Sequence, residues 1–179
     1  MNILKIFPFI KFESFNKELC FIVKTNFLKK VLFLLKNHFK YQFKVLTCIS
    51  GVDFPKNNYR FQIVYELLSL RFNSRVRLKC FVNELIPVDS VENVFFGANW
   101  WECEIWDLFG VFFSNHSNLV RILTDYGFEG YPLRKDFPLN GFYESRYHYT
   151  KHRVVYGEIE LCQEYRTFDF PSPWENAIK

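Results

Sequence analysis

Apolar and polar residues alternate most regularly in the middle of the chain. Between Tyr59 and Leu67 the odd positions are apolar, whereas most intervening positions are polar or charged. After a turn near 70–73, the even positions from Val76 to Val82 are apolar, and positions 75, 77 and 79 are charged. A period of two on both sides of a short turn predicts a β-hairpin with one buried face. We expect this face to contain Phe61, Ile63, Tyr65, Val76 and Leu78.

A helical period precedes this hairpin. Thr25 or Asn26 is placed to cap a helix that runs to about Phe39, because apolar residues recur there at helical spacing. The stretch 41–50 then predicts a strand, and Gly51 with the polar cluster after it predicts a turn.

Two capping signals follow the hairpin. Asp89, with Glu92 three residues later, predicts a short helix that Gly97 ends. Asn99 and Glu102 repeat the signal and predict a helix with Trp101, Ile105 and Leu108 on one face. One helix, three strands and two helices in this order predict an α+β fold, in which helices pack on an antiparallel sheet.

Beyond Gly110 the regular patterns weaken, although Val154, Val155, Ile159 and Leu161 are candidates for a short strand. We therefore expect an N-terminal extension at 1–14, an α+β domain at 15–120, and a long extended arm at 121–179.

The start of this arm is unusually apolar for a segment rich in glycine and proline. Residues 124–139 contain two of each, yet they also contain large apolar side chains. Two interpretations are open for its last part, the strap (residues 133–139). The strap folds back on its own domain, or it docks on another subunit, and the second is favoured because a small domain cannot easily cover so many aromatic residues.

Charge and cysteine usage restrict the possible functions. The net charge of +4 divides into +11 for residues 1–79, −6 for 80–120 and −1 for 121–179, which suggests complementary partner surfaces. The five cysteines are scattered without a C-x-x-C pair, so we expect a reducing compartment and neither a disulfide framework nor a metal cluster held by this chain alone. No stretch approaches the roughly 20 uncharged apolar residues that span a bilayer.

Three groups of residues have candidate chemistry, each with a simpler explanation. Glu102, Glu104 and Asp107 are close enough for acid–base work or metal binding, but flanking tryptophans favour a partner-facing helix. His148 and His152 have metal-ligand spacing in a segment unlike a helix. The isolated His116 has no neighbouring nucleophile. Because Gly-rich phosphate loops and hydrolase motifs are also absent, the sequence does not favour a stand-alone enzyme.

A fourth group gives the alternative function. It is a basic row on the exposed hairpin face, which a nucleic-acid-binding module would use. The row consists of Arg71, Arg75, Arg77 and Lys79.

The stretch WWECEIWDLFGVFFSNHSNLVRILTDYGFEGYPLRKDFPL closely resembles the signature region of the thirty-kilodalton subunits of respiratory complex I, the proton-pumping NADH:ubiquinone oxidoreductase. The likeness covers roughly residues 41–175. Glu102, Glu104, Asp107, His116 and Arg121 match the family pattern. Cys103 stands where arginine is usual, Ser117 replaces a common proline, and Val120 replaces the first of two basic residues.

The resemblance implies a non-catalytic scaffold subunit in the quinone-reducing module of complex I, in the matrix-facing peripheral arm at the mitochondrial inner membrane. It implies no cofactor on this chain, with flavin and iron–sulfur clusters on neighbouring subunits, and a C-terminal arm docked on the forty-nine-kilodalton quinone-site subunit. We therefore predict no catalytic, cofactor-binding or metal residues, no nucleic-acid partner and no membrane insertion. The predicted interface residues are Glu102, Glu104, Asp107, His116, Arg121, Tyr126, Phe128, Tyr131, Leu133, Arg134, Lys135, Asp136 and Phe137.

Overall fold

The computed structural model describes residues 10–15 and 18–168 of the 179-residue chain. The chain divides into two units, Met1–Phe137 and Pro138–Lys179, which we describe separately.

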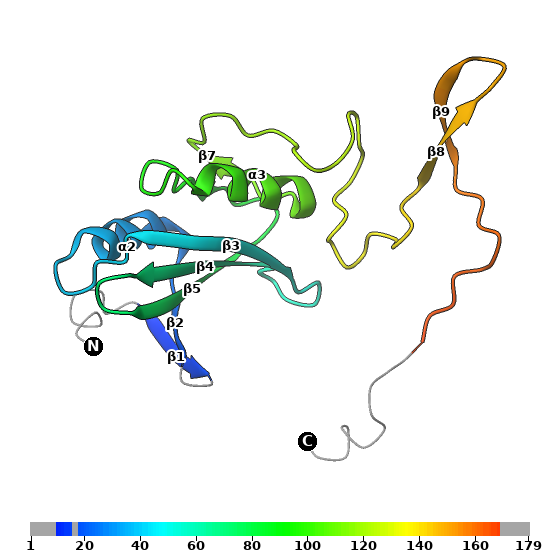
Figure 1. The fold of residues 1–179 in the computed structure, drawn as a ribbon. Helices are drawn as coiled ribbons and strands as arrows, with labels where there is room; N and C mark the ends of the chain where they lie inside the picture. Colours follow the sequence, from blue (N-terminus) through cyan, green and yellow to red (C-terminus); the bar gives the residue numbers. More distant parts are fainter. Residues whose placement is uncertain (1–9, 16–17, 169–179) are drawn as a thin grey trace, which may run out of the picture. The chain divides into compact units, whose positions relative to one another are not determined.

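A five-stranded sheet forms the centre of the first unit (Figure 1). Its strands lie in the order β1-β2-β5-β4-β3, and every neighbouring pair is antiparallel except β2 and β5, which are parallel. The strands are β1 (Lys11–Phe15), β2 (Glu18–Ile22), β3 (Val45–Asp53), β4 (Phe61–Ser69) and β5 (Ser74–Val82). The sheet is thus mixed, and its parallel pair joins segments more than 50 residues apart.

The predicted hairpin is confirmed as β4 and β5. Tyr65 is paired with Leu78, and all five side chains expected on the core face are buried. Gln62 is also buried, although it alternates with these residues along β4. The alternation therefore predicts both the pairing and the buried face.

Two helices complete the core of this unit, α2 (Thr25–Asn37) and α3 (Ala98–Phe109). Helix α2 buries apolar residues at helical spacing, including Leu28, Val31 and Leu35. Its N-cap is Lys24, and no side chain caps the helix; Thr25 bonds instead to the Asn26 side chain. The helix was predicted correctly, but its cap was not.

The short helix expected before Gly97 does not form, and this prediction is wrong. Residues 92–97 form turns, and β6 (Val88–Asp89) pairs in parallel with β7 (Phe113–Ser114). The Glu92 carboxylate does not cap a helix, because it accepts hydrogen bonds from Asn99 and Ser117. A tertiary contact thus uses the side chain that the capping signal required.

The observed boundaries differ from those expected. Residues 11–15 belong to the sheet as β1, and Ile10 lies in the core, so the region 1–14 is more than an extension. The first unit continues to Phe137 rather than ending at residue 120, because the segment 121–137 packs on α3 and β3. The second unit contains one hairpin, β8 (Tyr143–His148) with β9 (Arg153–Glu158). Val154 and Val155 lie in this hairpin, as the sequence suggested, whereas Ile159 and Leu161 follow it.

Neither α2 nor α3 is long and apolar enough to cross a membrane, and the described residues contain no other α-helix.

Candidate subunit interface around helix α3

Glu102, a predicted interface residue, lies inside the protein. Its carboxylate is fully buried and accepts hydrogen bonds from the Ser90 hydroxyl (2.6 Å) and the Val91 backbone N–H (2.7 Å). Burial raises the pKa of Glu102, and these two bonds oppose the rise. The side chain therefore fixes the 90–91 turn against α3 and has no surface left for a partner.

Asp107 is the second buried acid of α3 and organises the loop after the helix. One carboxylate oxygen accepts bonds from the backbone N–H groups of residues 122, 123 and 124. The other accepts bonds from Arg121 (3.1 Å) and the Thr124 hydroxyl (2.5 Å). Burial alone would raise the pKa of Asp107, but these bonds outweigh burial and lower it. The ionised Asp107 carboxylate thus holds the start of the arm on α3 through these hydrogen bonds.

His116 and Cys103 pack beside Glu102. The His116 Nε2 atom lies 3.7 Å from a Glu102 oxygen and 3.2 Å from the Asn99 carbonyl oxygen. Cys103 is buried, and its Sγ atom lies 3.4 Å from the Asn118 carbonyl oxygen. The Cys103 side chain therefore points into the protein interior. A larger basic residue at this position would need a different arrangement of the side chains around it. Glu104, by contrast, is only half-buried.

Arg134, Lys135 and Asp136, expected to contact a partner, bind their own unit instead. Arg134 donates a hydrogen bond to the Phe109 carbonyl oxygen (2.7 Å), and the Lys135 backbone N–H donates to Asp53 (2.8 Å). Arg60 connects Asp53 and Asp136, with distances of 2.8 and 2.7 Å. Of the two interpretations of the strap, the contacts of these three residues support the one in which it folds back on its own domain.

We call the residues that make these contacts the latch: Asp53, Arg60, Glu84, Arg134, Lys135 and Asp136. Glu84 belongs to it because Arg60 and Arg134 both pair with its carboxylate. The sequence did not reveal Asp53, Arg60 and Glu84 because their partners in the strap lie far away in the chain and form no motif with them.

Aromatic side chains fill the space between α3 and the latch. Tyr131 packs edge-on against Trp106, and the Arg134 guanidinium lies 4.5 Å from the centre of the Tyr131 ring. Gly110 ends α3 with φ +79°, and a Cβ atom there would lie 2.6 Å from the Tyr131 ring. Only glycine meets both conditions without strain. Phe128 and Phe137 pack nearby with their ring planes tilted by 39°, and both are half-buried.

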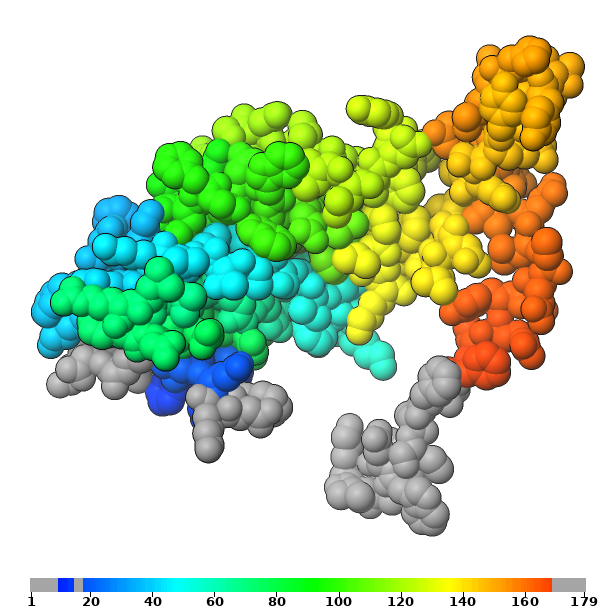
Figure 2. All heavy atoms as spheres, viewed as in Figure 1, coloured from blue at the N-terminus to red at the C-terminus, as the bar shows by residue number. Residues whose placement is uncertain are grey.

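Other apolar side chains on α3 and its neighbouring loops face solvent. Trp100 is 70% exposed, and Tyr126 is exposed completely. We call this set the α3 surface; it consists of Phe96, Trp100, Phe112, Leu123, Tyr126 and Leu133. The segments that carry it are green to yellow in Figure 2 and lie on one side of the first unit. Of the predicted interface residues, Tyr126 and Leu133 belong to this surface.

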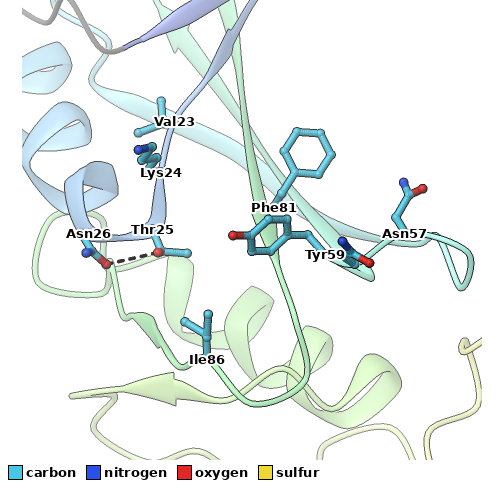
Figure 3. A pocket seen from close by; sticks show the side chains of 9 residues that line it. Val23, Lys24, Thr25, Asn26, Asn57, Tyr59, Phe81 and Ile86 are labelled. Atoms are coloured by element: carbon cyan, nitrogen blue, oxygen red, sulfur yellow. Dashed lines mark hydrogen bonds between the residues drawn. The ribbon is translucent and has the colours of Figure 1, made fainter.

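A pocket of about 660 Å³ lies at the N-terminal end of α2 (Figure 3). Its lining contains no carboxylate, imidazole or thiol group; it consists of Val23, Lys24, Thr25, Asn26, Asn57, Asn58, Tyr59, Phe81 and Ile86. The pocket therefore has no side chain suited to general-base catalysis or transition-metal binding at neutral pH. Within residues 10–15 and 18–168, no three His, Cys, Asp or Glu side chains lie close enough together to hold a metal ion. His148 and His152 therefore belong to no such group, despite their metal-ligand spacing in the sequence.

The basic row on the hairpin is partly neutralised by its own sheet. Arg77 pairs with Glu66 and Glu18, and Lys79 pairs with Glu13 at 3.2 Å. These acids reduce the positive potential that binding of a nucleic-acid backbone requires. The geometry therefore gives the alternative function little support.

Comparison with known proteins identifies the family of the chain. The family description "Respiratory-chain NADH dehydrogenase, 30 Kd subunit" matches residues 21–143. The chain is 52% identical to NADH-ubiquinone oxidoreductase subunit 9 of Reclinomonas americana over 177 residues, which cover 98% of this chain and 87% of that one. It is 49% identical to the protein of the same name from Prototheca wickerhamii, over 93% of this chain and 86% of that one.

A further relative has a different name. The chain is 54% identical to NADH dehydrogenase [ubiquinone] iron-sulfur protein 3 of Beta trigyna, over 87% of this chain and 81% of that one. These similarities define the class of the protein, which is a subunit of a respiratory-chain oxidoreductase. The chain belongs to the family of 30 kDa subunits of respiratory-chain NADH dehydrogenase, the enzyme known as complex I.

Proposed function

We propose that this chain is a non-catalytic scaffold subunit in the quinone-reducing module of complex I. The observation that carries the proposal is the α3 surface. Large aromatic side chains are exposed there on α3 and on the segments beside it, and internal bonds fix the buried acids of α3 and the loop that follows it. A rigid frame that presents exposed tryptophan and tyrosine is well suited to a permanent protein interface.

The proposed partner of the α3 surface is the forty-nine-kilodalton quinone-site subunit, within the matrix-facing peripheral arm at the mitochondrial inner membrane. The resemblance of residues 100–139 to the family signature supports this choice. Obligate interfaces of this kind commonly bury about 2,000–5,000 Å². The chain would hold its neighbours in the arrangement that electron transfer from NADH to ubiquinone requires, while flavin and iron–sulfur clusters are bound by those neighbours.

The test replaces exposed aromatic residues at different places on the first unit. Trp100→Ser and Tyr126→Ser remove side chains of the α3 surface, whereas Tyr59→Ser removes a tyrosine that is 54% exposed in the pocket region. We expect the first two to lower the amount of assembled complex on native gels by about tenfold or more, and Tyr59→Ser to have little effect.

Activity per assembled complex distinguishes a scaffold from a catalytic part. Because the proposal gives this chain no reacting group, quinone-reductase turnover per flavin should change little in every complex that still assembles. Normal assembly of the Trp100→Ser chain with turnover reduced about a hundredfold would contradict the scaffold role.

A further inference from the structure

Basic and apolar side chains gather at the end of the first unit where β4 turns into β5. The turn 70–73 joins these strands, and the loop 38–44 that follows α2 lies beside it, since Lys40 and Arg75 line one small pocket. Both segments lie at the left of the first unit in Figure 1. We call residues 38–44 and 70–75 the basic end.

The cations of the basic end have no acidic partner. They are Lys40, Lys44, Arg71 and Arg75, and all four are exposed. Among the residues that the structure describes, none of these four forms an ion pair. The sequence has no aspartate or glutamate at 19–52 or 67–83, and the flanking acids Glu18 and Glu66 both pair with Arg77. The basic end therefore presents a single sign of charge.

Large apolar side chains stand among these cations. Phe39, Leu70 and Phe72 are 67%, 71% and 48% exposed, and none of them belongs to the core. The Lys40 Nζ atom lies 5.6 Å from the centre of the Phe39 ring, and the central guanidinium carbon of Arg71 lies 5.6 Å from the centre of the Phe72 ring. Charges and rings therefore project together from the same two turns.

We propose that, in the unassembled chain, the basic end binds the head-group surface of an anionic phospholipid bilayer. Lysine and arginine attract anionic head groups, while phenylalanine and leucine beside them enter the boundary between head groups and acyl chains. The contact is peripheral, because only the side chains of two turns reach the lipid. This inference goes beyond the proposed function and does not use the α3 surface.

The form of the basic end favours a bilayer over a nucleic acid. Its apolar groups project from turns, and none of them lines the small pocket. One of them is the aliphatic Leu70, which contributes nothing to a phosphate contact and cannot stack on a base as an aromatic ring does. A bilayer is broad and uniformly anionic, so it can receive both turns at once and it matches a surface of one charge sign.

Flotation of the unaltered full-length chain with vesicles is the first test. Vesicles of phosphatidylcholine alone are compared with vesicles that also contain phosphatidylglycerol. Each basic residue near an anionic surface strengthens binding roughly fivefold, so we expect the chain to bind the anionic vesicles about a hundredfold more tightly or better. Added salt should weaken this binding, because it screens exposed charges. Equal binding to both kinds of vesicle, or binding to neither, would overturn the proposal.

Paired charge variants then locate the contact. Lys40→Gln with Arg71→Gln removes two cations from the basic end. The matched control, Lys56→Gln with Lys151→Gln, removes two exposed cations from the turn after β3 and the turn between β8 and β9. We expect the first pair to weaken vesicle binding about twentyfold and the control to leave it within about threefold. The same loss in both pairs would show that net charge alone is responsible, and the proposed site would be wrong.

Paired apolar variants test the lipid contact itself. Leu70→Ser with Phe72→Ser removes two apolar side chains of the basic end. The control, Leu85→Ser with Phe96→Ser, removes side chains that are 90% and 87% exposed elsewhere on the first unit. We expect the first pair to lower vesicle binding by about tenfold or more and the control to have little effect. All four positions are exposed, so thermal unfolding should show that both variants remain folded.

Single-stranded poly(U) RNA is the competing occupant. Tighter binding of this RNA than of the anionic vesicles, with both unchanged in the chain that carries Leu70→Ser and Phe72→Ser, would make the basic end a general polyanion site and overturn the lipid proposal. The proposed function fails on a different observation. If the chain were absent from complex I, that function would be wrong, while the vesicle results would stand.

Discussion

At the scale of single residues, the acids of α3 differ in what they stabilise. Asp107 is buried and fixes the backbone of three consecutive residues, whereas Glu104, one turn away, is half-buried and receives no comparable set of bonds from the described residues. The sequence places both in one predicted interface group, but their environments assign them separate roles.

Asp107→Ala should therefore destabilise the fold strongly. The substitution leaves three N–H groups without their acceptor and removes the carboxylate partner of Arg121, and loss of a buried charged partner typically lowers the free energy of unfolding by about 3–5 kcal/mol. Glu104→Ala is the control and should change it by about 0.5 kcal/mol or less. Urea unfolding of the isolated chain measures both values. Equal effects would contradict the role of Asp107 in holding the loop after α3.

Asp53 makes stability depend on pH. Its hydrogen bond from Arg60 is the main cause that lowers its pKa below the usual 3.8, and the Lys135 N–H adds to this effect. A lowered pKa in the folded state means that the stabilisation is complete above the unfolded value of 3.8 and is lost as the pH falls through the folded value. Asp107 and Asp136 shift in the same direction.

We expect the free energy of unfolding to fall as the pH decreases below about 5. Asp53→Asn should make this dependence shallower, because one of the acids with a lowered pKa is removed, and it should also lower stability at pH 7. Urea midpoints at pH 7, 5, 4 and 3 measure the slope. An unchanged slope in the variant would show that Asp53 titrates alike in both states.

At the scale of secondary-structure elements, predictability follows local pattern. The β4–β5 hairpin was predictable because one buried face imposes a period of two on adjacent segments. Strand β1 was missed because KFESF has little apolar alternation, and it is held by pairing with β2. The turn after Asp89 was misread because Glu92 bonds to Ser117, a contact between residues 25 apart that no local signal reveals.

Within β4, the Tyr65 hydroxyl is buried without a hydrogen-bond partner among the described residues. An unpaired buried hydroxyl costs about 1–3 kcal/mol. Tyr65→Phe should therefore leave the free energy of unfolding unchanged or raise it by about 1 kcal/mol. Thermal unfolding of the two chains measures the difference, and a marked loss of stability would show that the hydroxyl has a bonding role.

At the scale of the whole molecule, the strap has a different role from the one its sequence suggests. Its large apolar side chains favoured docking on a partner, but the latch uses Arg134 and Asp136 within the first unit. The partners of these charges lie some 25 to 80 residues away in sequence, so the sequence could identify the segment but not its target. Exposed neighbours such as Leu133 retain the predicted interface role as a proposal.

Arg134→Ala should accordingly destabilise the chain itself. It removes a hydrogen bond to Phe109 and the packing of the guanidinium on Tyr131 and Phe61, together about 2–4 kcal/mol. Leu133→Ala, at a 53% exposed neighbour, should change the free energy of unfolding by no more than about 0.5 kcal/mol. Denaturant unfolding of the isolated chain compares them. Equal stability of both variants would restore the partner-docking interpretation for Arg134.

The bond between Asp53 and the Lys135 N–H also has a consequence for the order of events on the ribosome. Asp53 emerges early in synthesis, while its backbone donor is made 82 residues later. Until the chain has grown past residue 136, the buried Asp53 carboxylate at the β3–β4 end of the sheet therefore lacks one of its hydrogen-bond donors. A nascent chain stopped near residue 120 would also lack the N–H groups that Asp107 requires. Completion of the first unit is thus coupled to translation of the segment that leads into the arm, so prematurely terminated chains should be recognisable by proteases as incompletely folded.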